Sequence, residues 1–345
     1  MIITRLDYAA LFFATFGLVA LFTPLMRKIA LRKNVMDAPT SEHKTHQEPI
    51  PYLGGVGIIL GIVIISLLAL FYQGMTSKIF WLEASVLGPA LILGAIGLWD
   101  DLKNLSPLPR FIAQTLAGIF TSVVLIASNT VGTPTGSKIV DGIITTIWIV
   151  GICNSINFFD NLDGGAAGTV AVSATALAIL AHHESQFLIS GLAIVTSGAM
   201  IGFLIYNKAP ARIYMGDAGA LFLGLLIATL TIRFHPTTLS QSISFATKVL
   251  LLAVPILDTS VAVLSRIRRG VSPFQGGKDH LSHRLIRLGI ERKYAALSLW
   301  ALSAGFALCA IIISRVGKSA QEAISVVAAA AWLLLFAFFF SKQDA

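Results

Sequence analysis

Residues 143–164 read IITTIWIVGICNSINFFDNLDG, an apolar run of membrane-spanning character that ends in polar side chains. These side chains recur every three residues, at Asn154, Asn157, Asp160 and Asp163. A helix turns by about 100° per residue, so neighbours in this series share a face while the whole series wraps half the helix. Carboxylates next to hydrocarbon are costly and are functional by default. The stretch therefore predicts a membrane helix with a functional polar end; the alternative is polar contact between helices followed by an ordinary turn.

The composition indicates a membrane protein throughout. Hydrophobic residues make up 56% of the 345 residues and charged residues only 12%, with a mean hydropathy of +0.82; a soluble domain carries roughly 25% charged residues. The formal net charge of +8 comes from basic residues in short loops, which the positive-inside rule explains without nucleic acid. Cys153 and Cys309 fall inside apolar stretches, so we expect free thiols and no disulfide.

Eleven apolar stretches can cross a bilayer, at about 20 residues per crossing. The fold class is therefore all-α, a polytopic membrane protein. We see no cleavable signal peptide and treat the first stretch as a span. The loops are too short for a soluble domain, so residues 1–345 are expected to form one membrane domain. The spans are expected near residues 8–26, 53–72, 84–99, 111–128, 143–159, 165–181, 187–206, 218–234, 245–265, 294–314 and 320–340.

Lysine and arginine are divided unequally between alternate segments. One set of segments holds eighteen of the 25 and the other holds seven. The richer side should be cytoplasmic, which places the N-terminus outside the cytoplasmic membrane and, with eleven spans, the C-terminus inside. Nearly all acidic and histidine chemistry falls in five loops on the same side, so we expect substrate to arrive from the cytoplasm.

Asp100 and Asp101 follow the apolar end of the third span. Adjacent carboxylates raise one another's pKa unless a cation neutralises them. Mg²⁺ takes carboxylate oxygens and keeps phosphate oxygens as further ligands. Together with the ribbon of Asn154 to Asp163, the pair predicts a site for a divalent metal and a phosphorylated ligand such as a nucleotide. The alternative is a solvated acidic start of a loop.

Asp217 lies in Tyr214-Met215-Gly216-Asp217-Ala218-Gly219, which leads directly into the eighth span. One interpretation is that Asp217 caps that helix by accepting orphan amide protons. The other is that the glycines let backbone approach a phosphate at the helix N-terminus while Asp217 binds the metal. Tyr214 either stacks on a base or sits at the membrane interface, as aromatic residues often do.

The longest basic loop contains His280-Leu281-Ser282-His283-Arg284. Two histidines at i and i+3 could bind zinc, but no cysteine is nearby and the carboxylates prefer Mg²⁺. Beside Arg266, Arg268 and Arg269, the loop is better interpreted as recognising a diphosphate, with attraction to anionic lipid as the alternative. Asp258, inside the ninth span, is expected to hold structure through a polar partner.

Five motifs in order and spacing resemble one family, the polyprenyl-phosphate N-acetylhexosamine-1-phosphate transferases, over about residues 8–340. The motifs are Asp37-Ala38-Pro39 through His46 to Gly55, Asp100-Asp101, Asn154 to Gly164, Met215 to Gly219, and His280 to Arg284. The resemblance implies transfer of a sugar 1-phosphate, most simply N-acetylglucosamine 1-phosphate, from a UDP-sugar to a polyprenyl phosphate such as undecaprenyl phosphate. UMP would be released, and the reaction would begin synthesis of a cell-envelope glycan.

The same resemblance implies the roles of residues. Mg²⁺, with Mn²⁺ as an alternative, would be bound by Asp217 with Asp100 and Asp101. Catalytic roles would fall to Asp100, Asp101, Asp160, Asp163 and His283, and substrate binding to Asn154, Asn157, Tyr214, His46, His280 and Arg284. Asp100 acting as a base toward the lipid phosphate is a separate hypothesis, because a phosphate monoester with a second pKa of about 6 needs little help at pH 7. A homodimer is left open.

Two departures from the family pattern bear on structure and donor. Asn161 replaces a turn glycine, and asparagine can adopt the left-handed conformation; Gly165 replaces a leucine. The pentapeptide translocases carry Thr-Pro-Thr-Met-Gly-Gly where this chain has Pro49 to Gly55, and three histidines where it has His280-Leu281-Ser282-His283. These differences favour a simple UDP-N-acetylhexosamine donor over phospho-MurNAc-pentapeptide. There are two rival functions. One is a CDP-alcohol phosphotransferase, but its motif has an arginine where this chain has Gly168. The other is an ion-coupled transporter, but its acidic residues would lie near the midplane of the bilayer.

Overall fold

A computed structural model describes residues 5–37, 49–72, 74, 76–273 and 277–342. Within these residues the chain forms thirteen helices and two short strands. Their bounds are α1 Arg5–Lys33, β1 Met36–Asp37, β2 Ile50–Pro51, α2 Gly54–Tyr72, α3 Ser77–Lys103, α4 Pro107–Ala127, α5 Lys138–Phe159, α6 Gly165–His183, α7 Phe187–Asn207, α8 Gly216–Arg233, α9 Gln241–Leu251, α10 Ala253–Arg268, α11 Leu281–Arg287, α12 Arg292–Ile313 and α13 Lys318–Ser341.

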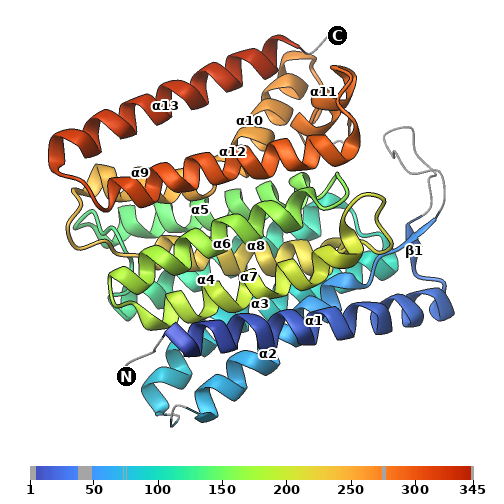
Figure 1. Ribbon diagram of the computed structural model, residues 1–345, viewed down its shortest axis with the longest axis horizontal. Coiled ribbons are helices and arrows are strands. Elements are labelled where there is room, and N and C mark those ends of the chain that lie inside the picture. The colour runs from blue at the N-terminus through green and yellow to red at the C-terminus, as the bar shows by residue number, and fades with distance from the viewer. Residues whose placement is uncertain (1–4, 38–48, 73, 75, 274–276, 343–345) are drawn as a thin grey trace.

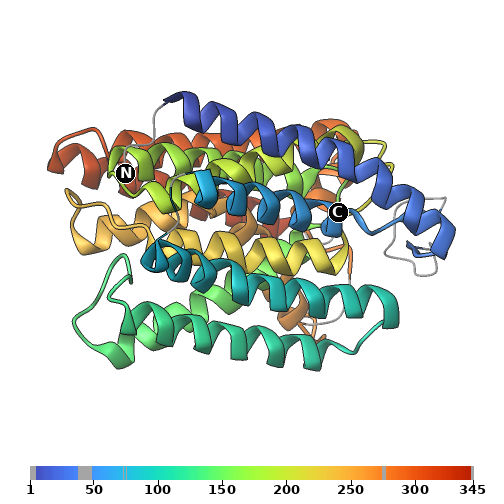
Figure 2. The same ribbon diagram turned by 90° about the horizontal axis from the view of Figure 1, so that it is seen from below.

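Ten of the described helices are long and apolar enough to cross a membrane, and the bent pair α9–α10 makes an eleventh span if the pair is counted as one. The expected all-α polytopic membrane protein is confirmed. The long helices run side by side along one direction, with the N-terminus at one end and β1 and α11 at the other (Figure 1). Figure 2 shows the same bundle from below, with α1 along its upper edge.

Helix α8 is the centre of the bundle. In its most apolar stretch, 89% of the residues are buried, against 11% in α13 at the periphery. α8 packs against α3 and α5, whereas many large apolar side chains of the outer helices are exposed, among them Phe71, Ile139 and Leu334. Exposed leucine and isoleucine suit a bilayer, because lipid tails are as apolar as those side chains. α8 is therefore the most buried of the spanning helices that the structure describes.

The structure corrects the predicted third and ninth spans. α3 runs to Lys103 and ends at Asn104, whose φ of 51° is left-handed; Asp100 and Asp101 are thus on the last turn of the helix, not in a loop after it. The ninth span is broken, with α9 and α10 meeting at 76°. Pro255 explains the break, since its ring clashes with the carbonyl four residues earlier, and that residue, Leu251, is the last of α9.

The two strands carry the first motif toward the acidic residues. β1 and β2 pair antiparallel, with Asp37 opposite Ile50 and Met36 opposite Pro51. The Tyr214 N–H donates to the Pro51 carbonyl at 2.8 Å, and Gly54 N–H donates to the Tyr214 carbonyl at 3.0 Å. The segment before α2 thereby extends along the segment before α8. His46 lies outside the described residues, so its expected role in substrate binding stays a prediction.

Candidate active site

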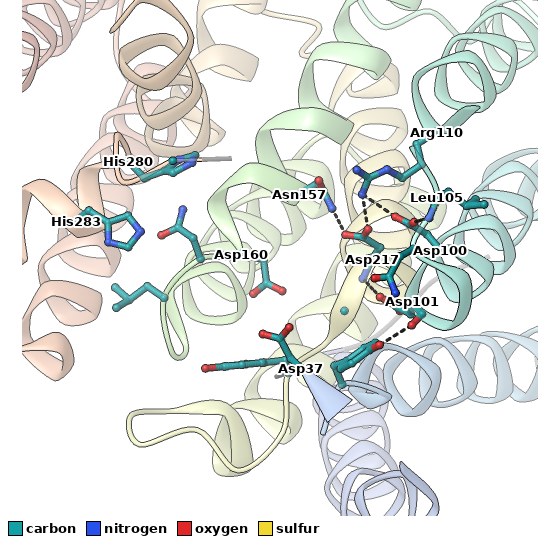
Figure 3. Close-up of a pocket in the computed structure, with 17 residues that line it drawn as sticks. Asp37, Asp100, Asp101, Leu105, Arg110, Asn157, Asp160, Asp217, His280 and His283 are labelled. Carbon is teal, nitrogen blue, oxygen red and sulfur yellow. Dashed lines mark hydrogen bonds and ion pairs between the residues drawn. The ribbon is translucent and has the colours of Figure 1, made fainter. Parts of the chain in front are cut away.

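A pocket of about 450 Å³ lies at the end of the bundle where β1 and α11 meet α3, α5 and α8 (Figure 3). It collects side chains from all five motifs, although they are far apart in sequence. The lining residues are Asp37, Tyr52, Asp100, Asp101, Asn104, Leu105, Arg110, Asn157, Asp160, Asn161, Leu162, Tyr214, Gly216, Asp217, Gly277, His280 and His283. Asp163, Asn154 and Arg284 are not among them.

The turn before α8 is fixed by close backbone contacts. Gly216 has a φ of +68°, and a Cβ there would lie 2.6 Å from an oxygen of Asp101, so both conformation and space require glycine. A Cβ on Gly97 would lie 2.3 Å from the Asp217 carbonyl, and one on Gly55 would lie 2.2 Å from the Gly219 nitrogen. α2 and α3 therefore approach the start of α8 as closely as backbones can.

Asp101 caps α8 from another helix. Its Oδ1 accepts from the Asp217 N–H at 2.8 Å, and its Oδ2 accepts from the Ala218 N–H at 3.1 Å. These amides are orphan donors of the first turn, and a carboxylate also suits the positive end of the helix. Tyr52 Oη donates to the Asp101 carbonyl at 2.6 Å. The structure thus gives Asp101 a positioning role, and its expected role as a metal ligand stays a prediction.

Asp217 does not cap its own helix. The first residues of α8 have no side-chain cap from within the helix, so the capping interpretation of Asp217 was wrong. Its side chain turns into the pocket, where the Asn157 amide donates to Oδ1 at 2.6 Å and Arg110 Nη1 donates to Oδ2 at 2.5 Å. Asp217 is therefore held by one neutral and one cationic donor, and it is about 25% exposed.

Arg110 bridges Asp100 and Asp217, two of the carboxylates predicted to bind the metal. Its Nη1 lies 2.7 Å from Asp100 Oδ2 and 2.5 Å from Asp217 Oδ2. Asp100 Oδ1 also accepts from the Leu105 N–H at 2.6 Å. Sequence reasoning missed Arg110, counting it only as a loop charge. Its position shortly after the acidic pair Asp100-Asp101 could have indicated that Arg110 lies close to these carboxylates.

Asp160 and Asp163 follow the helix instead of lying on it, because α5 ends at Phe159. The predicted ribbon is therefore helical only through Asn154 and Asn157. Asp160 lines the pocket. Asp163 accepts from the Ala211 N–H at 3.0 Å and from Tyr214 Oη at 3.3 Å, so it fixes the loop that carries Tyr214. Asn154 donates to Gln114 at 2.6 Å, which joins α5 to α4 away from the pocket. Its expected role in binding substrate stays a prediction.

Burial, followed by repulsion from Asp217 and Asp163, raises the pKa of Asp160 to about 7. A carboxyl whose pKa is higher in the folded protein favours folding below the unfolded value of about 3.9 and loses that contribution as pH rises through the folded value. We therefore expect the melting temperature in EDTA to fall by a few degrees more between pH 5 and 8 in the wild type than in Asp160→Asn. Parallel pH profiles of melting temperature would contradict this expectation.

The two histidines have different surroundings. His280 donates from Nδ1 to Asp258 Oδ2 at 2.7 Å, and its Nε2 lies 3.1 Å from Arg266 Nη2; since arginine can only donate, the imidazole is neutral with its proton on Nδ1. Asp258 thus has the polar partner expected of it. Burial lowers the pKa of His283 to about 4. His283 is therefore a neutral imidazole facing the pocket at pH 7.

Arg284 is directed away from the pocket. Its guanidinium donates to the carbonyls of Asp279 and Phe339, each at 2.7 Å, and to Ser265 Oγ at 2.8 Å. The side chain is 1% exposed, so its charge fastens α11 to α10 and α13. The described contacts give Arg284 a structural role, and its expected role in binding substrate stays a prediction.

Asn161 joins two of the motifs. It is absent from the described residues with positive φ, so the expected left-handed conformation was wrong. Its amide donates to the Phe158 carbonyl at 2.6 Å, and its Oδ1 accepts from Ser282 Oγ. The guanidinium of Arg266 lies 5.5 Å above the Phe158 ring, a cation–π contact. The turn after α5 is thereby fastened to the N-terminal end of α11, where the two histidines lie.

The carboxylates of the pocket suit a divalent cation in chemistry. Asp100 Oδ2 and Asp217 Oδ2 converge on one point, because both contact the same nitrogen of Arg110. Two carboxylates completed by phosphate oxygens and water are a usual Mg²⁺ site in phosphate-transferring enzymes. Among the residues that the structure describes, no three histidine, cysteine or acidic side chains form a metal cluster. The protein oxygens therefore fit an ion shared with a substrate phosphate.

Comparison with known proteins gives the family. The model of glycosyl transferase family 4 matches residues 83–235. The probable undecaprenyl-phosphate N-acetylglucosaminyl 1-phosphate transferase of Bacillus subtilis is 31% identical over 328 residues, which is 93% of this chain and 85% of the relative. The chain belongs to this family. The resemblance seen in the motifs is confirmed, and membership supports it over the CDP-alcohol phosphotransferase and the ion-coupled transporter.

Two further relatives carry different names. The decaprenyl-phosphate N-acetylglucosaminephosphotransferase of Mycolicibacterium smegmatis is 31% identical over 334 residues, covering 87% of this chain and 80% of its own. The phospho-N-acetylmuramoyl-pentapeptide-transferase of Geobacillus kaustophilus is 29% identical over 322 residues, covering 88% and 96%. This chain is thus similar along most of its length to proteins named for different sugar donors.

Proposed function

We propose that the protein transfers N-acetylglucosamine 1-phosphate from UDP-N-acetylglucosamine to undecaprenyl phosphate and releases UMP. The observation that carries the proposal is the meeting of Asp100 and Asp217 on Arg110, beside Tyr214, in a single pocket at one end of the bundle. The Bacillus subtilis relative, named for this activity, supports the choice of sugar and lipid.

In the reaction, an oxygen of the lipid phosphate attacks the phosphorus that bears the sugar. The bond from that phosphorus to the bridging oxygen breaks, and UMP takes the electron pair. Such transfers depend on positioning and charge neutralisation more than on covalent chemistry of the protein. Mg²⁺ or Mn²⁺ held by Asp100 and Asp217 would supply Lewis-acid neutralisation of the diphosphate. The lipid phosphate is mostly ionised at pH 7, with a second pKa of about 6, so Asp100 acting as a base stays a separate prediction.

The residues of this chain divide the remaining work. Asn157 and Arg110 orient Asp217 through its two oxygens. Asp101 holds the first turn of α8 in place. The neutral imidazole of His283 can donate a hydrogen bond to a phosphate or sugar oxygen without placing a further charge in the pocket. Tyr214 presents its ring to the base, and Asp163 holds the tyrosine from behind.

Tyr214→Ala is expected to raise the KM for the UDP-sugar several-fold and to leave kcat nearly unchanged. A stacked ring supplies about 0.5–1.5 kcal/mol beyond area burial, and loss of uniform binding appears in KM alone. Tyr214→Phe keeps the ring face and removes the hydroxyl that donates to Asp163 at 3.3 Å, so it should change little. If Tyr214 instead anchors the chain at the membrane interface, Tyr214→Ala will lower the melting temperature and affect both substrates alike.

The function is tested with purified protein, undecaprenyl phosphate and a panel of radiolabelled donors. The expected result is UMP release and labelled lipid with UDP-N-acetylglucosamine, dependent on added Mg²⁺, and much less product with its galacto-epimer or with UDP-MurNAc-pentapeptide. Preferential use of the pentapeptide donor would overturn the sugar assignment. Product formation at full rate in EDTA would overturn the metal assignment.

We further propose that the pocket faces the cytoplasm, with the N-terminus outside and the C-terminus inside. The eighteen-to-seven division of basic residues between alternate segments supports this orientation. Reporter fusions at the two termini measure it directly: a C-terminal fluorescent protein should mature, and an N-terminal one should not. The reverse pattern would overturn the proposed orientation. The proposed transferase activity would not be affected by that result.

A further inference from the structure

A second cavity, of about 250 Å³, lies between α1, α2, α3 and α7. Its α3 residues are in the first turns of that helix, whereas Asp100 is near the other end. Seventeen residues separate Glu83 from Asp100, so the two carboxylates are about 25 Å apart along the helix, at about 1.5 Å per residue. The cavity is thus separate from the candidate active site, toward the end of the bundle that holds the N-terminus (Figure 1).

The cavity is apolar except for two side chains, Glu83 of α3 and Ser66 of α2. Glu83 is 5% exposed and Ser66 is 3% exposed. Among the residues that the structure describes, neither Glu83 Oε1 nor Ser66 Oγ has a hydrogen-bond partner. Buried polar atoms are nearly always satisfied, and each exception calls for an explanation. Two exceptions that line one cavity suggest a ligand that supplies the missing partner.

The basic side chain in contact with the same part of α3 does not neutralise Glu83. Arg233 Nη1 lies 3.4 Å from the Leu82 carbonyl and 3.3 Å from Ser85 Oγ. Within the described part of the chain, no salt bridge includes Glu83. A carboxylate in an apolar membrane site stays ionised only where a cation or a donor compensates its charge. The complementary ligand group is therefore a cation that also donates hydrogen bonds.

The surroundings indicate that this cation is carried by a lipid. Phe71 and Trp81, on the two helices that carry Ser66 and Glu83, are each 68% exposed, as side chains in contact with hydrocarbon are. A headgroup with an ammonium could thus meet Glu83 while its acyl chains stay in the bilayer.

We propose that this cavity binds a phospholipid with a primary ammonium headgroup, whose ammonium pairs with Glu83 and hydrogen-bonds to Ser66. A primary ammonium has three N–H donors, enough for the glutamate and the serine together. A quaternary ammonium has none and cannot satisfy either oxygen. The cavity therefore discriminates between phosphatidylethanolamine and phosphatidylcholine, and it stabilises the contact of α2 and α3 with α1 and α7.

The test compares melting temperatures of the full-length protein in phosphatidylcholine nanodiscs with and without phosphatidylethanolamine. Phosphatidylethanolamine should raise the melting temperature of the wild type by a few degrees. Glu83→Gln keeps the shape of the side chain and removes its charge, so it should abolish the increase, and Ser66→Ala should reduce it. Transferase activity in phosphatidylcholine should be the same in wild type and Glu83→Gln.

Glu322→Gln is the matched control, because Glu322 is an exposed glutamate of α13 outside the cavity; it should retain the full increase. An equal increase in Glu83→Gln and wild type would overturn the proposal, as would no increase in the wild type. Free ethanolamine that reproduced the increase at the same headgroup concentration would also overturn it, because the bound group would then not need its lipid.

Discussion

Asp217→Asn is expected to lower kcat by at least about 10²–10³-fold, the usual loss when one preorganised electrostatic contact to a reacting phosphate or oxyanion is removed. The charge that would bind the metal disappears. The new amide would also present either its NH₂ group or its oxygen to the donors of Asn157 and Arg110, which now contact Oδ1 and Oδ2 at 2.6 and 2.5 Å. At least one of these contacts must be lost, so Asp100 and Arg110 should shift as well.

Turnover of the purified variant at saturating Mg²⁺, with a melting curve, measures this effect. Asp141→Asn is the matched control: Asp141 is also a buried carboxylate, 7% exposed, but it accepts from Thr135 near the start of α5, far along that helix from Asn157. The control should lose stability and keep kcat. Full activity of Asp217→Asn would remove Asp217 from the metal site, whereas equal loss in both variants would indicate a general effect of lost buried charge.

The fold could be predicted from hydropathy because each helix satisfies its own backbone and must be apolar where lipid contacts it. What failed was the position of the ends. α3 continues through Asp100 and Asp101 because their charges are compensated by Arg110 and by the amides of α8, and neither partner is visible locally. The break at Leu252 is indicated locally by Pro255, but hydropathy alone does not register it because the whole stretch is apolar.

The candidate site was predictable as a set of residue types, but the division of roles was not. Asp100 and Asp101 are neighbours in sequence, yet one contacts Arg110 while the other caps α8 across 116 residues. His283 and Arg284 are also neighbours, and only His283 faces the pocket. On a helix, adjacent residues differ in direction by about 100°, so only tertiary packing decides which one points into the pocket.

Arg110→Ala is expected to lower kcat/KM by roughly 10²–10³-fold, since arginines that stabilise a transferred phosphoryl group are worth about 10³–10⁵ in rate and Asp217 would lose a positioning contact as well. The same variant should need less Mg²⁺ for half-maximal activity. In the structure the guanidinium contacts the two oxygens, Asp100 Oδ2 and Asp217 Oδ2, to which a metal ion would bind, so its removal leaves the ion without a competitor.

The opposite directions of these two effects make the assignment of Arg110 testable. Arg110→Lys keeps the charge but loses the planar fork that contacts carboxylate and phosphate together, so it should restore only part of the rate. Lys103→Ala is the matched control, because Lys103 is an exposed cation at the end of α3 that does not line the pocket; it should change neither quantity. If Arg110 serves only to neutralise Asp100 and Asp217 in the absence of metal, Arg110→Ala will melt earlier in EDTA, recover with Mg²⁺ and turn over at the normal rate.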